Sequence, residues 1–379
     1  MGVEIIHKNK VWLSSPHMGG EEQSFVAEAF EQNWIAPLGP NVDSFEHDLE
    51  SYLGSESKVA LLSSGTAAIH LGLKLLGVER GDDVICQSFT FSASANPIQY
   101  LGANPIFVDS EKDTWNICPS LLEKCILERI AFGKKPKAII AVHLYGMPYK
   151  VDLINSISQK YNIPILEDSA EALGSMFNGQ NCGTFADISI LSFNGNKIIT
   201  TSGGGALVTK NVDIKSKAVY LATQARDNAP HYQHSQIGYN YRMSNVLAGI
   251  GRGQMKVLKD RVEGRRKNYS TYTEQLSSLT NIEFLSEPKG YFSNRWLTCI
   301  LTKSFEVREG IRKALEDENI ESRPLWKPMH MQPVFAEELN YVNGVSEDLF
   351  NRGLCLPSGT NIPKEELLRT SDIIKKIVK

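Results

Sequence analysis

The chain has 379 residues, a formal net charge of -3, 22% charged residues and 42% hydrophobic residues. This composition is ordinary for a soluble globular protein, and the length suits two domains better than one small core. A charge so near zero gives no general reason to expect binding to nucleic acid or to an anionic membrane.

Targeting and redox signals point to the cytoplasm. The N-terminal segment carries Lys8 and Lys10 but no apolar segment behind them, so we expect no signal peptide. The longest apolar runs, such as residues 138–142, have the length of a strand and are too short to cross a membrane. The six cysteines are scattered without a C-x-x-C pair, which predicts reduced thiols and neither a metal site nor disulfides.

The first chemical signal is a turn of small residues. An extended arm and two helices are predicted before it, over residues 1–20, 21–32 and 41–53. A strand over 59–62 then runs into Ser63-Ser64-Gly65-Thr66-Ala67-Ala68, and a helix continues to Leu76. This arrangement directs backbone N–H groups and the positive helix end at an anion. Ser64 as an ordinary helix cap is the other interpretation, but a cap needs one hydroxyl residue rather than a run, so a phosphate site is favoured.

Strands and helices alternate through the middle of the chain. Strands are predicted over residues 83–86, 105–108, 138–142 and 163–166. Helices are predicted between them, over residues 91–101, 119–130 and 151–161. This rhythm predicts an α/β domain with a mostly parallel central sheet and helices on both faces. Ligands of such sheets lie beyond the carboxyl ends of the strands, so residues just after strands are the candidates for a site.

Asp168 stands at the end of one of these strands, in the run Leu166-Glu167-Asp168-Ser169. An aspartate beside apolar chain is costly unless it pairs with a cation. The protonated nitrogen of a pyridine ring is such a partner, and the pair keeps the ring an electron sink. An aspartate that caps a helix starting at Ser169 is the other interpretation, and taken alone it is the commoner case.

Lys197 is the only charged residue between Asp187 and Lys210. It follows an apolar run and the turn Asn194-Gly195-Asn196, and it precedes hydroxyl residues and three glycines, Gly203 to Gly205. Desolvation at the end of a buried strand favours the neutral amine, which is the nucleophilic form. This predicts a lysine that forms a Schiff base with pyridoxal phosphate. A loop lysine that reaches solvent past the glycines is an equal alternative at this point.

The last part of the chain predicts a second domain. Aromatic and polar residues alternate around Arg242, which suits either a ligand site or tyrosine packing beside an ion-paired arginine. A basic helix predicted over 254–276 has a solvated face and bridges the domains. His330 follows it, and a satisfied surface histidine is the commoner role. We predict a large domain over 1–255 and a small α+β domain over 256–379, with a strand near 296–301 and helices near 307–316 and 346–352.

Taken together, the ordered motifs resemble those of the DegT/DnrJ/StrS family of nucleotide-sugar aminotransferases. Each motif is weak alone, but their order is highly specific and the match covers nearly the whole chain. The motifs are residues 64–68, Thr90-Phe91, 167–171, 192–197, 203–205, 238–242 and Arg323-Pro324. The resemblance implies a fold-type I enzyme, with an aspartate aminotransferase-like fold and pyridoxal phosphate as its cofactor.

The resemblance also implies roles for individual residues. Lys197 would hold the cofactor covalently and move the proton in catalysis, a role that needs its neutral amine. Asp168 would pair with the ring nitrogen, and Phe91 would stack on the ring face. The residues that would hold the phosphate are Gly65, Thr66 and Ser192.

Further implied contacts involve a second subunit and the substrates. Asn240 would reach the cofactor phosphate of the other subunit, which implies a homodimer with active sites shared across the interface. Glu171 stands where many family members carry Gln or His near the ring hydroxyl group. The residues implied in binding the sugar nucleotide and the glutamate carboxylates are Arg226, Arg242 and His330.

A narrower resemblance concerns the substrate. Six stretches are similar to the 4-aminotransferases of the UDP-N-acetylbacillosamine pathway, namely residues 15–20, 35–39, 194–205, 223–226, 323–327 and 356–360. This similarity implies a UDP-linked 4-keto-6-deoxy-N-acetylglucosamine as acceptor and L-glutamate as amino donor. The product would be UDP-4-amino-4,6-dideoxy-N-acetylglucosamine, formed by a ping-pong mechanism in which one lysine serves both halves.

Four other functions are weighed against this one. The same fold could act on GDP-4-keto-6-deoxymannose, as in perosamine synthesis, or at C3 of a keto sugar. A sugar dehydratase of the family would carry His in place of Lys197. A non-catalytic regulator that binds pyridoxal phosphate would be expected to have an appended DNA-binding segment. A nicotinamide-dependent dehydrogenase would need the G-x-G-x-x-G fingerprint, which the sequence lacks.

Overall fold

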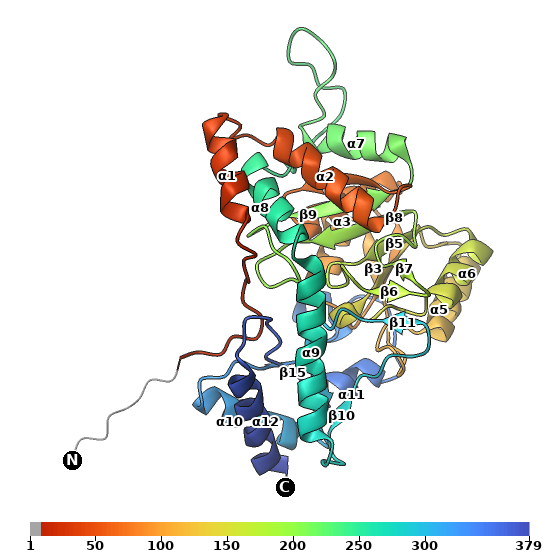
Figure 1. The fold of residues 1–379 in the computed structure, drawn as a ribbon. Helices are drawn as coiled ribbons and strands as arrows, with labels where there is room; N and C mark the ends of the chain where they lie inside the picture. Colours follow the sequence, from red (N-terminus) through yellow and green to blue (C-terminus); the bar gives the residue numbers. More distant parts are fainter. Residues whose placement is uncertain (1–8, 379) are drawn as a thin grey trace.

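The computed structural model describes residues 9–378 (Figure 1). Its α-helices are α1 (Glu22–Glu31), α2 (Pro40–Leu53), α3 (Gly65–Leu75), α4 (Asn96–Tyr100), α5 (Pro119–Ala131), α6 (Val151–Tyr161), α7 (Val212–Ala222), α8 (Asn245–Met255), α9 (Leu258–Leu276), α10 (Phe305–Asp317), α11 (Val345–Arg352) and α12 (Lys364–Val378). Its strands are β1 (Lys58–Leu62), β2 (Asp83–Gln87), β3 (Asn104–Val108), β4 (Ala138–Val142), β5 (Ile165–Asp168), β6 (Met176–Phe177), β7 (Gln180–Asn181), β8 (Ile188–Ser192), β9 (Gly205–Thr209), β10 (Glu283–Phe284), β11 (Tyr291–Phe292), β12 (Thr298–Leu301), β13 (Arg323–Pro324), β14 (Asn340–Tyr341) and β15 (Gly353–Leu356). Residues 1–8 of the predicted arm lie outside the described residues.

The central sheet has eight strands in the order β1-β9-β8-β5-β4-β2-β3-β14. β9 runs antiparallel to β1 and β8, and all other neighbours pair in parallel. The carboxyl ends of β1, β5 and β8 therefore lie along one edge of the sheet, which is where such sheets bind ligands. The prediction of a mostly parallel α/β sheet is confirmed.

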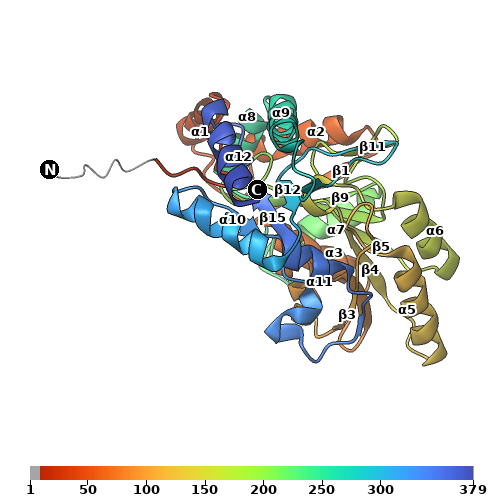
Figure 2. The same ribbon diagram turned by 90° about the horizontal axis from the view of Figure 1, so that it is seen from below.

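Helices cover both faces of this sheet because successive side chains of a buried strand point to opposite sides. In β4, Ile140 joins the core beneath α3, α4 and α7, whereas Ile139 joins the core beneath α5 and α6. α2 and α8 cover the same face as α5 and α6, over β1, β9 and β8. Figures 1 and 2 show α5 and α6 side by side on this face.

A smaller sheet with the order β10-β12-β15-β13 is antiparallel throughout. α9, α10 and α12 pack on one face of it, and α9 connects this region to the layer of α2 and α8 (Figure 1). On its other face Cys355 packs with Tyr145 and Trp115 of the large sheet region. Since β14 pairs with β3, the chain after residue 258 contributes to both sheets. The division at residues 255 and 256 stays a prediction.

Two predicted helices differ from the structure. The helix expected over 91–101 is a 3-10 turn, Ser92–Ser94, followed by α4, and Phe91 itself is extended with φ -75° and ψ 145°. Pro97 is the reason, because proline suits the first turn of a helix but cannot continue one from upstream. The helix expected over 254–276 is two helices, since Val257 leaves the helical region at φ -110° and ψ 5°.

No helix within residues 9–378 combines the length and the apolar composition needed to cross a membrane.

Close packing between α8 and α1 gives the first prediction. A Cβ atom at Gly253 would lie 2.7 Å from the backbone nitrogen of Glu22, and backbone cannot move aside as a side chain can. Gly253→Ala should therefore destabilise the fold by about 1–3 kcal/mol despite alanine's better helix propensity. The matched control is Gly310→Ala in α10, whose Cβ would meet Ile377 at an ordinary 3.5 Å. This control should gain up to about 1 kcal/mol. Denaturant unfolding measures both, and equal stability of the two variants would contradict the packing argument.

Candidate active site

A cavity of about 300 Å³ lies at the carboxyl ends of the central strands. Its walls come from the turn before α3, the segment after β2, the end of β5 and the segment after β8. Seven residues predicted for the site line it, namely Gly65, Thr66, Phe91, Asp168, Glu171, Ser192 and Lys197. A larger open groove of about 1220 Å³, between segment 283–291 and α11, contains none of them.

Lys197 reaches into this cavity from the loop after β8. Its Nζ atom lies 3.6 Å from Oε1 of Glu171 and 4.3 Å from the ring centroid of Trp296. The side chain is only 12% exposed, so the interpretation of Lys197 as a solvent-reaching loop lysine is not supported. Burial raises the pKa of Glu171, and the nearby Lys197 charge offsets part of that rise.

Asp168 is the last residue of β5 and is 3% exposed. Its Oδ2 atom accepts a hydrogen bond from Ser94 Oγ at 2.6 Å, and Oδ1 accepts one from the Ala170 N–H at 3.1 Å. Burial raises the pKa of Asp168, although the Ser94 hydrogen bond offsets part of the rise. No helix begins at Ser169, so the capping interpretation is wrong. Among residues 9–378, no basic side chain forms an ion pair with this carboxylate.

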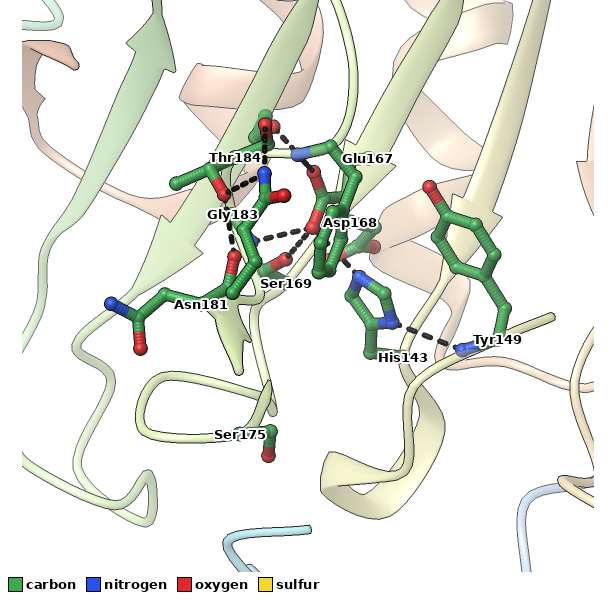
Figure 3. Close-up of polar contacts among 12 residues, drawn as sticks. His143, Tyr149, Glu167, Asp168, Ser169, Ser175, Asn181, Gly183 and Thr184 are labelled. Carbon is green, nitrogen blue, oxygen red and sulfur yellow. Dashed lines mark hydrogen bonds and ion pairs between the residues drawn. The ribbon is translucent and has the colours of Figure 1, made fainter. Parts of the chain in front are cut away.

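Glu167 precedes Asp168 on the same strand, and its carboxylate is surrounded by protein hydrogen-bond donors (Figure 3). Because side chains alternate along a strand, it points away from the cavity. His143 Nε2 lies 2.7 Å from Oε1 of Glu167. Further donors to this carboxylate are Ser169 Oγ, Ser189 Oγ and the N–H groups of Gly183 and Phe185. Burial alone would raise the pKa of Glu167, but His143 and these donors lower it below the usual value. The network fixes the end of β5 that carries Asp168.

The turn before α3 forms the opposite end of the cavity. Ser64 caps the helix by accepting a hydrogen bond from the Ala67 N–H, so part of the cap interpretation is correct. The next two N–H groups, on Gly65 and Thr66, belong to the first turn of a helix and have no intrahelical partner. A Cβ atom at Gly205 would lie 2.4 Å from the Gly65 nitrogen, so only glycine lets β9 start this close. These two N–H groups and the helix dipole suit a phosphate.

Aromatic rings form the mouth of the cavity. The ring of Phe91 is 5.7 Å from that of Trp326 and the residue is 54% exposed. An exposed ring at the mouth of a cavity offers a flat face for another ring. Trp326 also lines the cavity, and its backbone N–H donates to the Tyr145 hydroxyl group at 2.8 Å.

Two predicted substrate residues lie outside the cavity with partners of their own. Arg242 forms a buried ion pair with Glu46 at 2.5 Å and donates to the Leu61 carbonyl at 3.0 Å. The interpretation as an ion-paired arginine therefore fits this chain. His330 Nδ1 lies 2.7 Å from Ser88 Oγ, which fits a satisfied histidine.

The other two residues lie on the segment between α7 and α8, which projects from the molecule in Figure 1. Arg226 is exposed, with its guanidinium group 4.5 Å from the ring centroid of Tyr232. Asn240 is exposed and bridges to Thr223. Neither residue contacts the cavity of its own chain.

Sequence reasoning did not identify Ser94, Trp296 and Trp326 as site residues. Ser94 falls within the segment predicted to be a helix, where nothing distinguishes one serine from another. Trp296 was expected to begin a core strand, and indeed it is 1% exposed. The signal that could have identified it is an amphipathic ring beside polar residues, Asn294 and Arg295, at the start of a strand.

The donor set of the cavity fits pyridoxal phosphate. A buried carboxylate without a cationic partner suits a protonated ring nitrogen, Lys197 supplies the amine, and the start of α3 suits the phosphate. Within residues 9–378 no cluster of His, Cys, Asp and Glu has the arrangement of a metal site.

Comparisons with known proteins agree with this arrangement. The model of the DegT/DnrJ/EryC1/StrS aminotransferase family matches residues 16–375. The protein EpsN of Bacillus subtilis (strain 168), whose name describes a pyridoxal phosphate-dependent aminotransferase, is 51% identical over 97% of this chain and 96% of its own. The GDP-perosamine synthase of Escherichia coli O157:H7 is 36% identical over 95% of this chain and 96% of its own.

A solved structure is also similar over nearly the full length. It is described as a sugar aminotransferase, Spr1654 of Streptococcus pneumoniae, in its PLP form, and it has 26% sequence identity and a TM-score of 0.89. The alignment covers 98% of this chain and 99% of that one. The expected fold and enzyme class, a transaminase that uses pyridoxal phosphate, are confirmed at the level of the family. The chain belongs to the DegT/DnrJ/EryC1/StrS aminotransferase family.

Proposed function

We propose that this enzyme transfers the amino group of L-glutamate to C4 of a UDP-linked 2-acetamido-2,6-dideoxy-4-keto-hexose. The product is UDP-4-amino-4,6-dideoxy-N-acetylglucosamine. The observation that carries the reaction type is one cavity that holds an amine, Lys197, and a buried carboxylate without a cation, Asp168. The choice of a UDP sugar rests on the similarity of six stretches to 4-aminotransferases that act on such sugars.

The cofactor would be held at three points. Asp168 keeps a proton on the ring nitrogen, while the N–H groups of Gly65 and Thr66 and the hydroxyl group of Ser192 bind the phosphate. Phe91 limits movement of the ring at the mouth of the cavity. When bound, pyridoxal phosphate supplies an electron sink that stabilises negative charge on the carbon that loses its proton.

Lys197 is the residue that would move the proton of the substrate carbon. Within the described residues it is the only basic side chain that lines the cavity, so its amine is the group available to take a proton from the substrate carbon. With the cofactor bound, the same amine would give this proton back, and it would serve the keto sugar by the reverse transfer. Glu171, 3.6 Å away, limits where the amine can move.

A homodimer would complete the site. Glutamate and a sugar diphosphate both bring negative charge, yet no arginine of the described chain lines the cavity. Arg226 and Asn240 lie on the projecting segment 226–240, where Tyr232 is 80% and Ile237 is 82% exposed. Large exposed apolar residues on a projecting loop favour an interface. We place these two residues in the cavity of the partner subunit.

The cytoplasm is the proposed location. The six cysteines are all free and buried, which suits a reducing compartment.

A GDP-linked 4-keto-6-deoxy sugar is the second candidate substrate. The observation that favours it is the 36% identity to a GDP-perosamine synthase over 95% of this chain.

The substrate prediction is tested by supplying L-glutamate together with either the UDP-linked or the GDP-linked 4-keto sugar. We expect amination at C4 of the UDP sugar, identified by mass spectrometry and NMR of the product. Specificity is measured as the ratio of kcat/KM values, which reports differential binding of the two transition states. A ratio that favours the GDP sugar would establish the second candidate instead.

Replacement of Lys197 tests the proton-transfer role. Lys197→Ala should lower turnover by at least about 10²–10⁴-fold, which is the usual contribution of a general acid-base group. Borohydride reduction should fix the cofactor to the Lys197 peptide of the wild type and not to the corresponding peptide of the variant. Peptide mass spectrometry detects the attached cofactor. Lys210→Ala, at an exposed lysine, is the matched control and should behave as wild type. Turnover retained by Lys197→Ala would refute the mechanism.

Replacement of Asp168 separates stability from function. Burial raises the folded-state pKa of Asp168. The contribution of Asp168 to the folding stability of the cofactor-free protein therefore becomes less favourable as pH rises through that pKa. At neutral pH, Asp168→Asn should therefore keep or increase cofactor-free stability while it weakens cofactor binding and turnover. The control Asp109→Asn should lose about 1–3 kcal/mol, because that carboxylate accepts N–H groups from Ser110, Asn343, Gly344 and Ser346. Thermal unfolding with and without cofactor measures both effects. A cofactor-free Asp168→Asn protein as unstable as Asp109→Asn would contradict this prediction.

A further inference from the structure

We propose that Trp296 is the positioning residue of Lys197, holding both the peptide before the lysine and the lysine amine itself. The inference uses the proposed role of Lys197 as the group that binds the cofactor and carries the proton. It adds that the amine has a defined position when it is not bonded to the cofactor. That position lies between the indole face of Trp296 and the carboxylate of Glu171.

The first contact fixes the backbone. The indole Nε1–H of Trp296 donates to the carbonyl oxygen of Asn196 at 2.7 Å, and Asn196 is the residue immediately before Lys197. Ser14 Oγ donates to the same oxygen at 2.7 Å. A carbonyl with two donors is held in place, so the lysine starts from a fixed point.

The second contact acts on the amine. Nζ of Lys197 lies 4.3 Å from the centroid of the Trp296 ring, within the range of a cation-π interaction. Oε1 of Glu171 lies 3.6 Å from the same Nζ atom. A tryptophan face attracts an ammonium group and does so more strongly when both are shielded from water. The indole face and the Glu171 carboxylate together hold the amine in this position.

Asn294 connects the backbone of Trp296 to the backbone of the segment that carries Glu171. Its Oδ1 atom accepts the Trp296 N–H at 2.9 Å. Its Nδ2 atom donates to the carbonyl oxygens of Glu171 and Leu173, each at 2.9 Å. The relative position of the indole and the Glu171 segment is thus set by one buried carboxamide.

The backbone on both sides of the Trp296 side chain is also held in place. Arg295 adopts a left-handed conformation with φ 52°, which is costly for a residue other than glycine and persists only where its surroundings hold it. The Trp296 carbonyl oxygen accepts from Arg265 Nη1 at 2.9 Å. With its N–H, carbonyl and indole N–H all paired, Trp296 cannot follow the lysine when the lysine moves.

This arrangement has a consequence for turnover. Each half-reaction releases the lysine amine and later requires its return. An amine that rests on a fixed aromatic face stays within reach of the substrate carbon. Trp296 would therefore act on the rate of the proton-transfer steps more than on substrate affinity.

The test compares Trp296→Leu with Trp296→Phe. Both side chains are apolar, but only phenylalanine keeps an aromatic face, and both lack the indole N–H. In the full-length chain freed of cofactor, Lys197 is labelled with an amine-reactive reagent at one neutral pH and measured by peptide mass spectrometry. Because an amine held against an aromatic face is less accessible to the reagent than a released one, Lys197 of Trp296→Leu should be labelled about 2- to 30-fold faster than that of Trp296→Phe.

The matched control is Trp115→Leu. Trp115 is 4% exposed and belongs to the same aromatic cluster, but it does not line the cavity. Its loss should leave the labelling rate of Lys197 unchanged. Thermal unfolding identifies variants that fail to fold, and Trp296→Met replaces Trp296→Leu in that event.

Kinetics supply the second measurement. Trp296→Leu should lower kcat with little change in KM, and Trp296→Phe should recover part of the loss. Equal labelling of Lys197 in the leucine and phenylalanine variants, or the same change in Trp115→Leu, would overturn the proposal. Labelling does not depend on amino transfer, so the expected labelling with no activity on any keto sugar would refute the proposed function alone.

Discussion

The site depends on a carboxylate that the fold buries without a cation. Asp168 ends a fully buried strand, and a buried ion costs several kcal/mol unless a partner of opposite charge offsets it. Ser94 and the Ala170 N–H offset only part of that cost, since the pKa of Asp168 is still raised. A ligand that brings a cation to this point recovers the remainder. The protonated ring nitrogen that we propose as the partner of Asp168 would be such a ligand.

Two adjacent carboxylates show how the strand achieves this. Glu167 and Asp168 point to opposite sides of β5, because side chains alternate along a strand. Glu167 lies among protein donors (Figure 3), and Asp168 lines the cavity. Donors on several segments satisfy Glu167, including His143, which is stacked on Tyr149 with ring centroids 4.5 Å apart. The satisfied carboxylate anchors the strand end and the loop that carries Gly183. Asp168, which accepts hydrogen bonds from Ser94 and Ala170 but forms no ion pair, is thereby held at the wall of the cavity.

Lys197 and Asp168 became candidates because an isolated charge in apolar surroundings needs a partner, and the family resemblance then favoured the cofactor roles over a loop lysine and a helix cap. The structure places both residues in the lining of one cavity. The break at Val257 could not be predicted, since no glycine or proline interrupts that stretch of sequence. Two-residue strands such as β13 and β14 are too short to show an alternation of apolar and polar residues. Trp296 was missed because its role depends on Asn294 and Glu171, whose proximity only the tertiary fold creates.

The lining of the cavity carries little positive charge that could bind an anionic substrate. Among the described residues that line it, Lys197 is the only base, and it is engaged by Glu171 and Trp296. Such a cavity can hold a cofactor, but its net contribution to binding a dicarboxylate or a diphosphate is small. Arg242 cannot be released for that purpose cheaply, because its buried ion pair with Glu46 and its hydrogen bond to the Leu61 carbonyl would both be lost. Arg226 is exposed and does not line the cavity of its own chain, which is the reason for proposing that it serves the partner subunit.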